Sequence, residues 1–221
     1  MANTATMVPR LTEQRLLLHG VPWSTYETLL ACFEGRHLRL TYDRGELEVM
    51  VVSWAHEWAK KILARMVEAL TEELNISLFG LGNTTFRQEA LARGLEPDEC
   101  YYLRERLPLS DPNQPNTTLT LAPDLVLEVE ISRSVLDRMA IYAALGVPEI
   151  WCTDGDSIRV YQLQAHHYIE IGRSIAFPWL PMTELASFVR RRGEVSDTQL
   201  VKDFRQWVRT TIAPRLQRPS N

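Results

Sequence analysis

The stretch that decides the fold is Leu121-Ala-Pro-Asp-Leu-Val-Leu-Glu-Val-Glu-Ile131, a short apolar and β-branched run that carries three carboxylates. Successive side chains of a strand point to opposite faces of a sheet. One face then carries Leu125, Leu127, Val129 and Ile131, and the other carries Asp124, Val126, Glu128 and Glu130. Burying carboxylates costs free energy unless something positive holds them. The acidic face therefore indicates a divalent cation, a set of basic partners or an open cleft.

The segments around this strand alternate between strand and helix patterns. The predicted elements are an N-terminal β-hairpin at 37–52, helices at 54–74 and 135–145, strands between 148 and 171, and helices at 182–190 and 198–215. This order predicts an α/β fold of the mixed α+β type, with a mixed sheet flanked by helices. We expect one domain at 11–180 and a C-terminal helical extension at 181–221 packed on it. A stretch rich in Pro and Asn at 104–120 predicts a surface insertion.

The starts of the two central helices are predicted from polar residues that precede apolar stripes. Ser53 is expected to cap 54–74, and Ser132-Arg-Ser134 is expected to cap 135–145. In the first turn after Ser53, we expect His56 to be a cap residue and Glu57 a surface charge.

The composition is that of a globular protein. Of the 221 residues, 45% are hydrophobic and 24% are charged, so a real core can form. The net charge of −4 gives no overall nucleic-acid signature, so DNA binding would need a local basic surface or a metal. Only three of the 24 basic residues are lysines, namely Lys60, Lys61 and Lys202. Arginine stays protonated, so it can stabilise an anion but cannot act as a general base.

Cysteine usage and hydropathy bear on location. Cys32, Cys100 and Cys152 are odd in number and widely spaced, which fits buried thiols in a reducing compartment. We find no run long enough to cross a membrane and no apolar segment typical of a signal peptide at the N-terminus. The sequence therefore predicts a cytoplasmic protein without membrane partners.

Two predicted strands supply carboxylates for one site. Asp98 begins one strand, and Asp124 and Glu128 lie on the other. If the strands are neighbours, Asp98 and Glu128 approach within range of one metal ion. Oxygen ligands suit Mg²⁺ or Mn²⁺, and such an ion can bind a phosphodiester oxygen and lower the pKa of a water. The spacing is a weak signal for a metal-dependent nuclease.

An ion-pair network without metal also accounts for the acidic face. Asp124 would then bond backbone or Arg133, and Glu130 would pair with Arg138. On the second strand of the hairpin, Glu46 and Glu48 are expected to face solvent.

Several motifs together resemble a known family. They are Glu96-Pro-Asp-Glu-Cys-Tyr-Tyr102, Pro123-Asp-Leu-Val-Leu-Glu-Val129 and Tyr142-Ala-Ala-Leu-Gly-Val-Pro-Glu-Ile-Trp151, joined by Gly45-Glu-Leu-Glu48 and the helix opened by Ser53 and His56. Over about residues 20–175, the chain resembles the Uma-two family of restriction endonucleases in the PD-(D/E)XK nuclease superfamily.

The resemblance implies a restriction-endonuclease-like core, Mg²⁺-dependent (or Mn²⁺-dependent) hydrolysis of DNA, and action as a homodimer that cuts two strands. The superfamily's Pro-Asp element matches Asp98, and its Asp/Glu-x-Lys element matches Glu128. The resemblance further implies that Asp124 is an additional metal ligand and that Glu57 is an acid contributed by the first core helix.

The chain departs from the family pattern at the lysine. Glu130 stands where the lysine is expected. That lysine can migrate to the following helix in the superfamily, and the matching position here is Arg138. Arg138 can stabilise charge but cannot accept a proton. The alternatives are Lys60 or Lys61 on the first helix, or no lysine at all.

Three functions therefore stay open from the sequence. The first is a Mg²⁺-dependent DNA endonuclease with Asp98, Asp124, Glu128 and Arg138 in its site. The second is a catalytically impaired module with the nuclease fold that acts in nucleic-acid binding or protein interaction, which the Glu130 substitution favours. The third is a structural oligomer that uses tryptophans at an interface.

Overall fold

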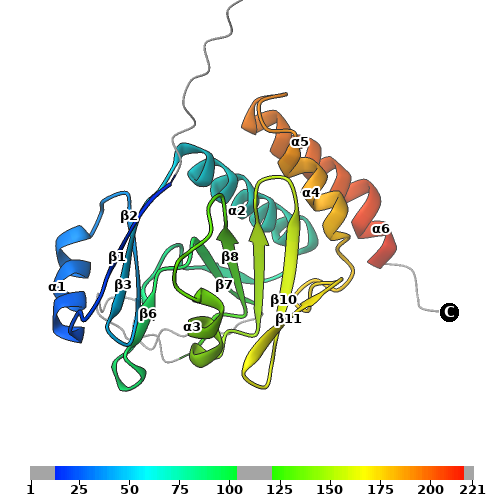
Figure 1. The fold of residues 1–221 in the computed structure, drawn as a ribbon. Helices are drawn as coiled ribbons and strands as arrows, with labels where there is room; N and C mark the ends of the chain where they lie inside the picture. The colour runs from blue at the N-terminus through cyan, green and yellow to red at the C-terminus, as the bar shows by residue number, and fades with distance from the viewer. Residues whose placement is uncertain (1–12, 104–120, 217–221) are drawn as a thin grey trace, which may run out of the picture.

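The structure is a computed structural model that describes residues 13–103 and 121–216. The predicted surface insertion at 104–120 lies outside the described residues. The described chain forms two sheets with helices packed on them (Figure 1).

The opening strand lies inside a six-stranded sheet, which we call the central sheet. Its strand order is β11 (His167–Ile171), β10 (Ile158–Gln164), β9 (Glu149–Thr153), β8 (Leu125–Val129), β7 (Glu99–Leu103) and β4 (Leu78–Gly80). Strand β8 runs parallel to β9 and antiparallel to β7. The prediction of a mixed sheet is thus confirmed, and β8 and β7 are neighbours as the metal-site argument requires.

A second sheet, the N-terminal sheet, has five strands. Its order is β1 (Gln14–Leu18), β3 (Glu46–Val51), β2 (Leu38–Asp43), β6 (Arg93–Leu95) and β5 (Phe86–Gln88). The hairpin of β2 and β3 is confirmed, but its membership of a larger sheet was not predicted. Strand β6 contains Gly94, and glycine is depleted in strands. Pairing with both β2 and β5 imposes the strand there.

Helices cover both faces of the central sheet. Helix α2 (Trp54–Leu74) packs on one face, where Leu125 and Leu127 share a core with Ile62 and Met66. Helix α3 (Arg138–Leu145) lies on the other face, next to Val126. In the N-terminal sheet, α1 (Trp23–Phe33) buries Tyr26 against the strands. The two-faced pattern of β8 therefore follows from the strand period, and the acid-bearing face is the one under α3.

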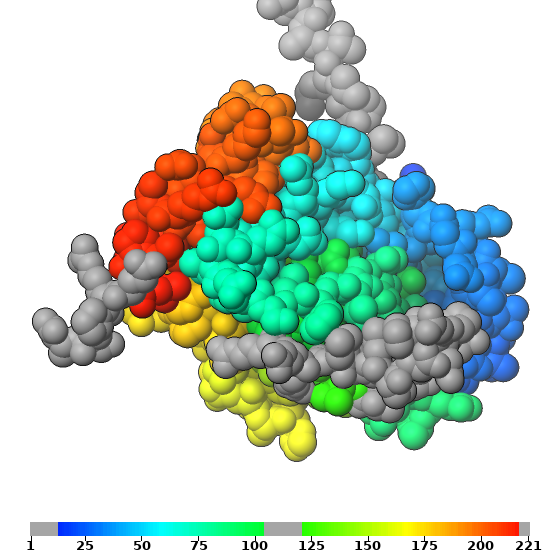
Figure 2. Space-filling model, turned by 180° about the vertical axis from the view of Figure 1, so that it is seen from behind, coloured from blue at the N-terminus to red at the C-terminus, as the bar shows by residue number. Residues whose placement is uncertain are grey.

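The C-terminal helices pack on α2. They are α4 (Met182–Arg190), α5 (Asp197–Trp207), a π-helical turn η2 (Val208–Ile212) and α6 (Ala213–Leu216), and a short 3₁₀ turn η1 (Glu89–Leu91) lies earlier in the chain. Leu185 and Phe204 belong to the same buried cluster as Ile62. Figure 2 shows these helices, in orange and red, on one side of α2 and the N-terminal elements, in blue, on the other.

Helix α3 begins later than the sequence predicts. Asp137 caps it, because its carboxylate accepts a hydrogen bond of 3.0 Å from the Ala140 amide. The predicted cap at Ser132–Ser134 is wrong, because those hydroxyls bond distant carboxylates instead. Residues 130–137, which we call the β8–α3 segment, are therefore a connection with its own tertiary contacts.

Across residues 13–103 and 121–216, no helix combines the length and the apolar character needed to cross a bilayer.

Candidate active site

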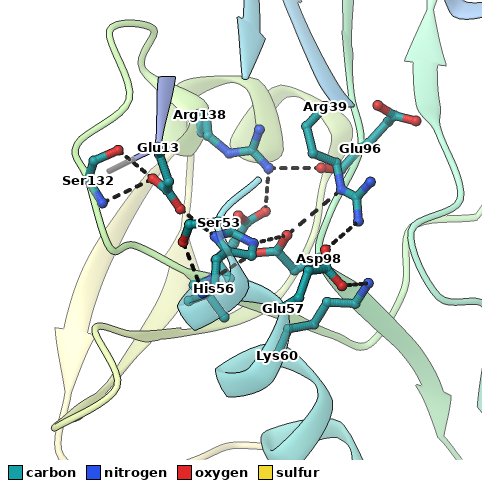
Figure 3. Close-up of polar contacts among 12 residues, drawn as sticks. Glu13, Arg39, Ser53, His56, Glu57, Lys60, Glu96, Asp98, Ser132 and Arg138 are labelled. Atoms are coloured by element: carbon teal, nitrogen blue, oxygen red, sulfur yellow. Dashed lines mark hydrogen bonds and ion pairs between the residues drawn. The ribbon is translucent and has the colours of Figure 1, made fainter. Parts of the chain in front are cut away.

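Buried acids from two segments meet where the central and N-terminal sheets join. Asp98 lies in the link between β6 and β7 and is 2% exposed, and Glu128 lies on β8 and is 7% exposed. Arg138, the first residue of α3, reaches both sheets, because it donates to Thr41 Oγ1 on β2 at 2.6 Å and to Glu128 on β8 at 2.6 Å. Close neighbours in space thus come from widely separated parts of the chain (Figure 3).

Asp98 is held by donors on both carboxylate oxygens. Its Oδ1 lies 2.7 Å from His56 Nε2, and its Oδ2 accepts a hydrogen bond of 2.8 Å from the Val129 amide. Burial alone would raise the pKa of Asp98, but the hydrogen bond and charge of His56, together with Arg138, hold that pKa below its usual value. Asp98 is therefore an anion at neutral pH.

His56 lies between two carboxylates in the first turn of α2. Its Nδ1 lies 2.7 Å from Glu13 Oε1, opposite the contact with Asp98, and the residue is 1% exposed. Burial lowers the pKa of His56, but the bonds to Asp98 and Glu13 outweigh this effect and raise it to about 9. Both ring nitrogens then donate, and His56 is an imidazolium. The expectation of a simple cap residue is wrong, although its spacing from buried Ala59 and Leu63 placed it on the buried stripe.

Glu128 is paired with Arg138. The Arg138 guanidinium donates to Glu128 Oε1, the Tyr142 hydroxyl bonds the same oxygen, and Arg138 also donates to the Glu96 carbonyl at 2.9 Å. Burial holds the pKa of Glu128 above its usual value. The Arg138 charge opposes this shift, and the Asp98 charge adds to it. Among the described residues, Glu128 Oε2 has no hydrogen-bond donor. That oxygen is therefore available to accept a hydrogen bond or to coordinate a cation.

A cavity of about 20 Å³ lies between these acids. Its lining includes Asp98, Glu128, Val129, His56 and Arg138. This volume is enough for one water-sized particle. A larger pocket of about 490 Å³, also lined by Glu128 and Arg138, adjoins it.

The carboxylate oxygens at the cavity and the volume of the cavity fit one divalent cation. Within the described residues, no group of three or more His, Cys, Asp or Glu side chains is arranged to hold a metal ion. Mg²⁺, however, usually keeps several waters and binds through one or two carboxylates, which Asp98 and Glu128 supply. Each carboxylate oxygen offers two lone pairs, so those with one bond retain one. The fit therefore depends on two acids rather than on a closed set of protein ligands.

The structure does not bring Asp124 to this cavity. Its Oδ2 accepts a hydrogen bond of 2.8 Å from the Leu103 amide at the end of β7. The backbone bond that the sequence offered as an alternative is therefore present. Of the described residues that line the cavity, Asp98 and Glu128 are acids from the predicted ligand set and Asp124 is not among them.

Glu57 is connected to Asp98 through the Arg39 guanidinium. It is 38% exposed and is 3.5 Å from Arg39 and 3.6 Å from Lys60. The Arg39 Nε is in turn 3.9 Å from Asp98 Oδ1 (Figure 3). Glu57 therefore reaches Asp98 only through Arg39, and Lys60 pairs with Glu57.

Glu130 points to a different partner from the one expected. It is 3.1 Å from Arg159 on β10, so the predicted pairing of Glu130 with Arg138 is wrong. Arg138 instead pairs with Glu128, two residues earlier on β8. Glu128 lies within β8 and Glu130 lies just past its end, and the two acids pair with different arginines.

Glu48 was expected to face solvent, and this is wrong. It is buried, accepts from Arg15 at 2.7 Å and from the Val135 amide at 2.7 Å, and bonds the Ser134 hydroxyl. Sequence reasoning also missed Glu13 and Arg15. Apart from the contact that they make with each other, their partners are more than 30 residues away, and no local pattern marks them.

Comparisons with known proteins add the following. The model of the Uma2 family, described as "Putative restriction endonuclease", matches residues 23–184. A solved structure from Anabaena variabilis, titled as a putative nuclease belonging to DUF820, is similar with a TM-score of 0.43 and 15% identity. That similarity covers 75% of this chain and 90% of the other. The search of curated proteins found no match.

Proposed function

The chain belongs to the Uma2 family, described as "Putative restriction endonuclease", and from this we propose that it is a DNA endonuclease that hydrolyses phosphodiester bonds with Mg²⁺ or Mn²⁺. The observation that carries the proposal is the meeting of Asp98 and Glu128 at one water-sized cavity beside Arg138. This pair supplies the oxygen ligands that such ions prefer.

Asp98 and Glu128 are the residues that would hold the ion. When bound, such an ion polarises a phosphoryl oxygen and lowers the pKa of a bound water. Asp124 and Glu57 support the site from outside, Asp124 by fixing the end of β7 and Glu57 through Arg39.

The arginines of the site can contact the phosphate. Arg138 is fixed by Thr41 and the Glu96 carbonyl, so its guanidinium is oriented before substrate arrives. Arg39 is buried, and its Nε has no hydrogen-bond partner among the described residues. Spare donors on a buried arginine favour a phosphate oxygen as their acceptor.

These basic groups also supply local positive charge, although the net charge of the chain is negative. Arg15, Arg39, His56 and Arg138 all line the small cavity. Four cationic side chains there offset the acids and favour an anionic backbone. DNA is therefore the proposed partner despite the acidic chain.

The proposal is tested with supercoiled plasmid in Mg²⁺, in Mn²⁺ and in EDTA. The wild type should nick the plasmid only with metal. Asp98→Asn and Glu128→Gln should each lose roughly 100-fold or more in rate, because losing a ligand charge should cost at least as much as losing a residue that only orients a ligand. Glu170→Gln is the matched control and should cleave like the wild type, because Glu170 is an exposed acid on β11 that lines neither pocket. Equal cleavage by the wild type and Glu128→Gln would contradict this site.

A second candidate is a non-catalytic module with the same fold that binds nucleic acid or protein. It is favoured by the ion pairs of His56 with Asp98 and of Arg138 with Glu128, which already compensate both acids. It predicts DNA binding without metal-dependent nicking. Titration calorimetry that detects no heat of Mg²⁺ or Mn²⁺ binding would favour this candidate over the first.

Pairing of two chains and a cytoplasmic location belong to the same proposal. A homodimer would present two sites to two strands, and a light-scattering mass of one chain would contradict it. The three cysteines are free thiols, and the two in the sheet, Cys100 and Cys152, are buried, which supports a reducing compartment.

A further inference from the structure

We infer that Glu13 is a positioning residue for the site: it orients Asp98 through His56 and holds the β8–α3 segment through Ser132. The relevance of Asp98 rests on the proposed function, whereas the positioning itself is measured without cleavage. Glu13 precedes β1 and lies outside residues 23–184, the part of the chain that the family model matches.

The carboxylate of Glu13 is saturated by donors from three parts of the chain. Oε1 lies 2.7 Å from His56 Nδ1. Oε2 accepts from the Ser132 amide at 3.1 Å and from Arg15 at 3.1 Å, and the Ser132 hydroxyl bonds it too. The Glu13 side chain is fully buried. A buried carboxylate with four donors is fixed in one orientation, because rotating it would leave donors unpaired.

The imidazole ring of His56 connects Glu13 to Asp98. Glu13 and Asp98 lie at opposite nitrogens of His56, each at 2.7 Å. A ring hydrogen-bonded at both nitrogens cannot turn without breaking one bond. Glu13 therefore fixes the plane of the imidazole, and the imidazole fixes Asp98 Oδ1.

The same carboxylate fixes the connection that leads from Glu128 to Arg138. Ser132 bonds Glu13 through its amide and hydroxyl, and Arg15 donates to the Ser132 carbonyl at 3.0 Å. Arg15 also bonds Glu48, which holds Ser134 and the Val135 amide. The N-terminal sheet thus clamps the segment that places Arg138 over Glu128.

Only a carboxylate meets these demands. Every group that faces Glu13 in these contacts is a donor, from α2, β1 and the β8–α3 segment. An amide has one acceptor oxygen and one donor nitrogen, so glutamine would direct an NH₂ group at a donor whichever way it turned. Glu13→Gln therefore removes the charge and one acceptor oxygen while it keeps the size of the side chain.

The test is ¹⁵N–¹H NMR of the imidazole of His56 in metal-free protein at pH 7. The wild type should show both ring N–H signals in slow exchange, and Glu13→Gln should lose the Nδ1–H signal and bind Mn²⁺ about tenfold more weakly, the lower end of the loss typical for residues that orient metal ligands. Glu73→Gln is the matched control, since Glu73 also pairs with arginines, Arg205 and Arg209, but far from the site. It should leave both readouts unchanged.

Unchanged His56 signals in folded Glu13→Gln would overturn the inference. If that variant does not fold, Ser132→Ala replaces it, because it removes one hydroxyl donor to Glu13 and no charge. Ser132→Ala should shift the Nδ1–H resonance, and an unmoved resonance would equally overturn the inference. A wild type that fails to nick plasmid would count against the proposed function alone, because the NMR signals do not depend on cleavage.

Discussion

At the scale of single residues, the site is governed by paired charges under burial. Asp98 and Glu128 have pKa values shifted in opposite directions, because Asp98 faces an imidazolium while burial outweighs the arginine for Glu128. Arg138 donates to Thr41, to the Glu96 carbonyl and to Glu128. Two buried acids at one cavity thus have distinct electrostatic environments.

The pKa of His56 predicts how stability depends on pH. Its folded value of about 9 lies above the unfolded value near 6.5, so its contribution is fully present below about pH 6.5 and is lost as the pH rises through about 9. The loss should be on the order of 3 kcal/mol. Urea unfolding in EDTA between pH 6 and 9.5 should show this slope in the wild type and a flatter one in His56→Gln.

The control for that measurement is His167→Gln, because His167 is exposed at the start of β11. It should keep the wild-type slope. Parallel pH profiles for the wild type and His56→Gln would contradict the imidazolium between Glu13 and Asp98.

Residue-level prediction from the sequence succeeded where a local period carried the information. The alternation of β8 placed Glu128 on the face opposite that of Leu127. The partner of Arg138 did not follow from this period, because Arg138 was expected to pair with Glu130 and pairs with Glu128. Glu13 could not be found this way. Its contacts to His56 and Ser132 span 43 and 119 residues, and only the tertiary fold brings them together.

At the scale of elements, the helices follow the sequence closely except where tertiary contacts override a local cap. Ser53 caps α2 as predicted, with its hydroxyl oxygen accepting from the His56 amide at 3.2 Å. Ser132 and Ser134 have the same capping chemistry, but buried carboxylates from the N-terminal sheet bind them. Asp137 is therefore the residue that caps α3.

The C-terminal helices should unfold together with the sheets. Phe204 on α5 is buried in the same cluster as Ile62 of α2. Phe204→Ala should therefore cost about 3–5 kcal/mol, because it leaves a cavity in a shared core. Urea unfolding followed by tryptophan fluorescence and far-UV circular dichroism should give one coincident, shifted transition.

The control is Lys202→Ala, an exposed change on the same helix, which should move the free energy of unfolding by no more than about 0.5 kcal/mol. Two separate transitions would contradict the packing of 181–221 on the same domain as 11–180.

At the scale of the whole molecule, the site belongs to neither sheet alone. Asp98 and Glu128 come from the central sheet and its entry. Thr41, which accepts from Arg138, and Glu48, which accepts from Ser134, come from the N-terminal sheet. The sequence predicted the mixed sheet because strand and helix periods are local. It did not predict the second sheet, because β5 and β6 are three residues each and depend on tertiary pairing, β6 with β2 and β5 with β6.

The most direct test of the central claim is a crystal of the protein soaked in Mn²⁺ and examined by anomalous scattering. We predict a manganese peak between the carboxylates of Asp98 and Glu128. A map with no peak there, or with its strongest peak at Asp124 instead, would contradict the assignment of this cavity as the metal site of a nuclease.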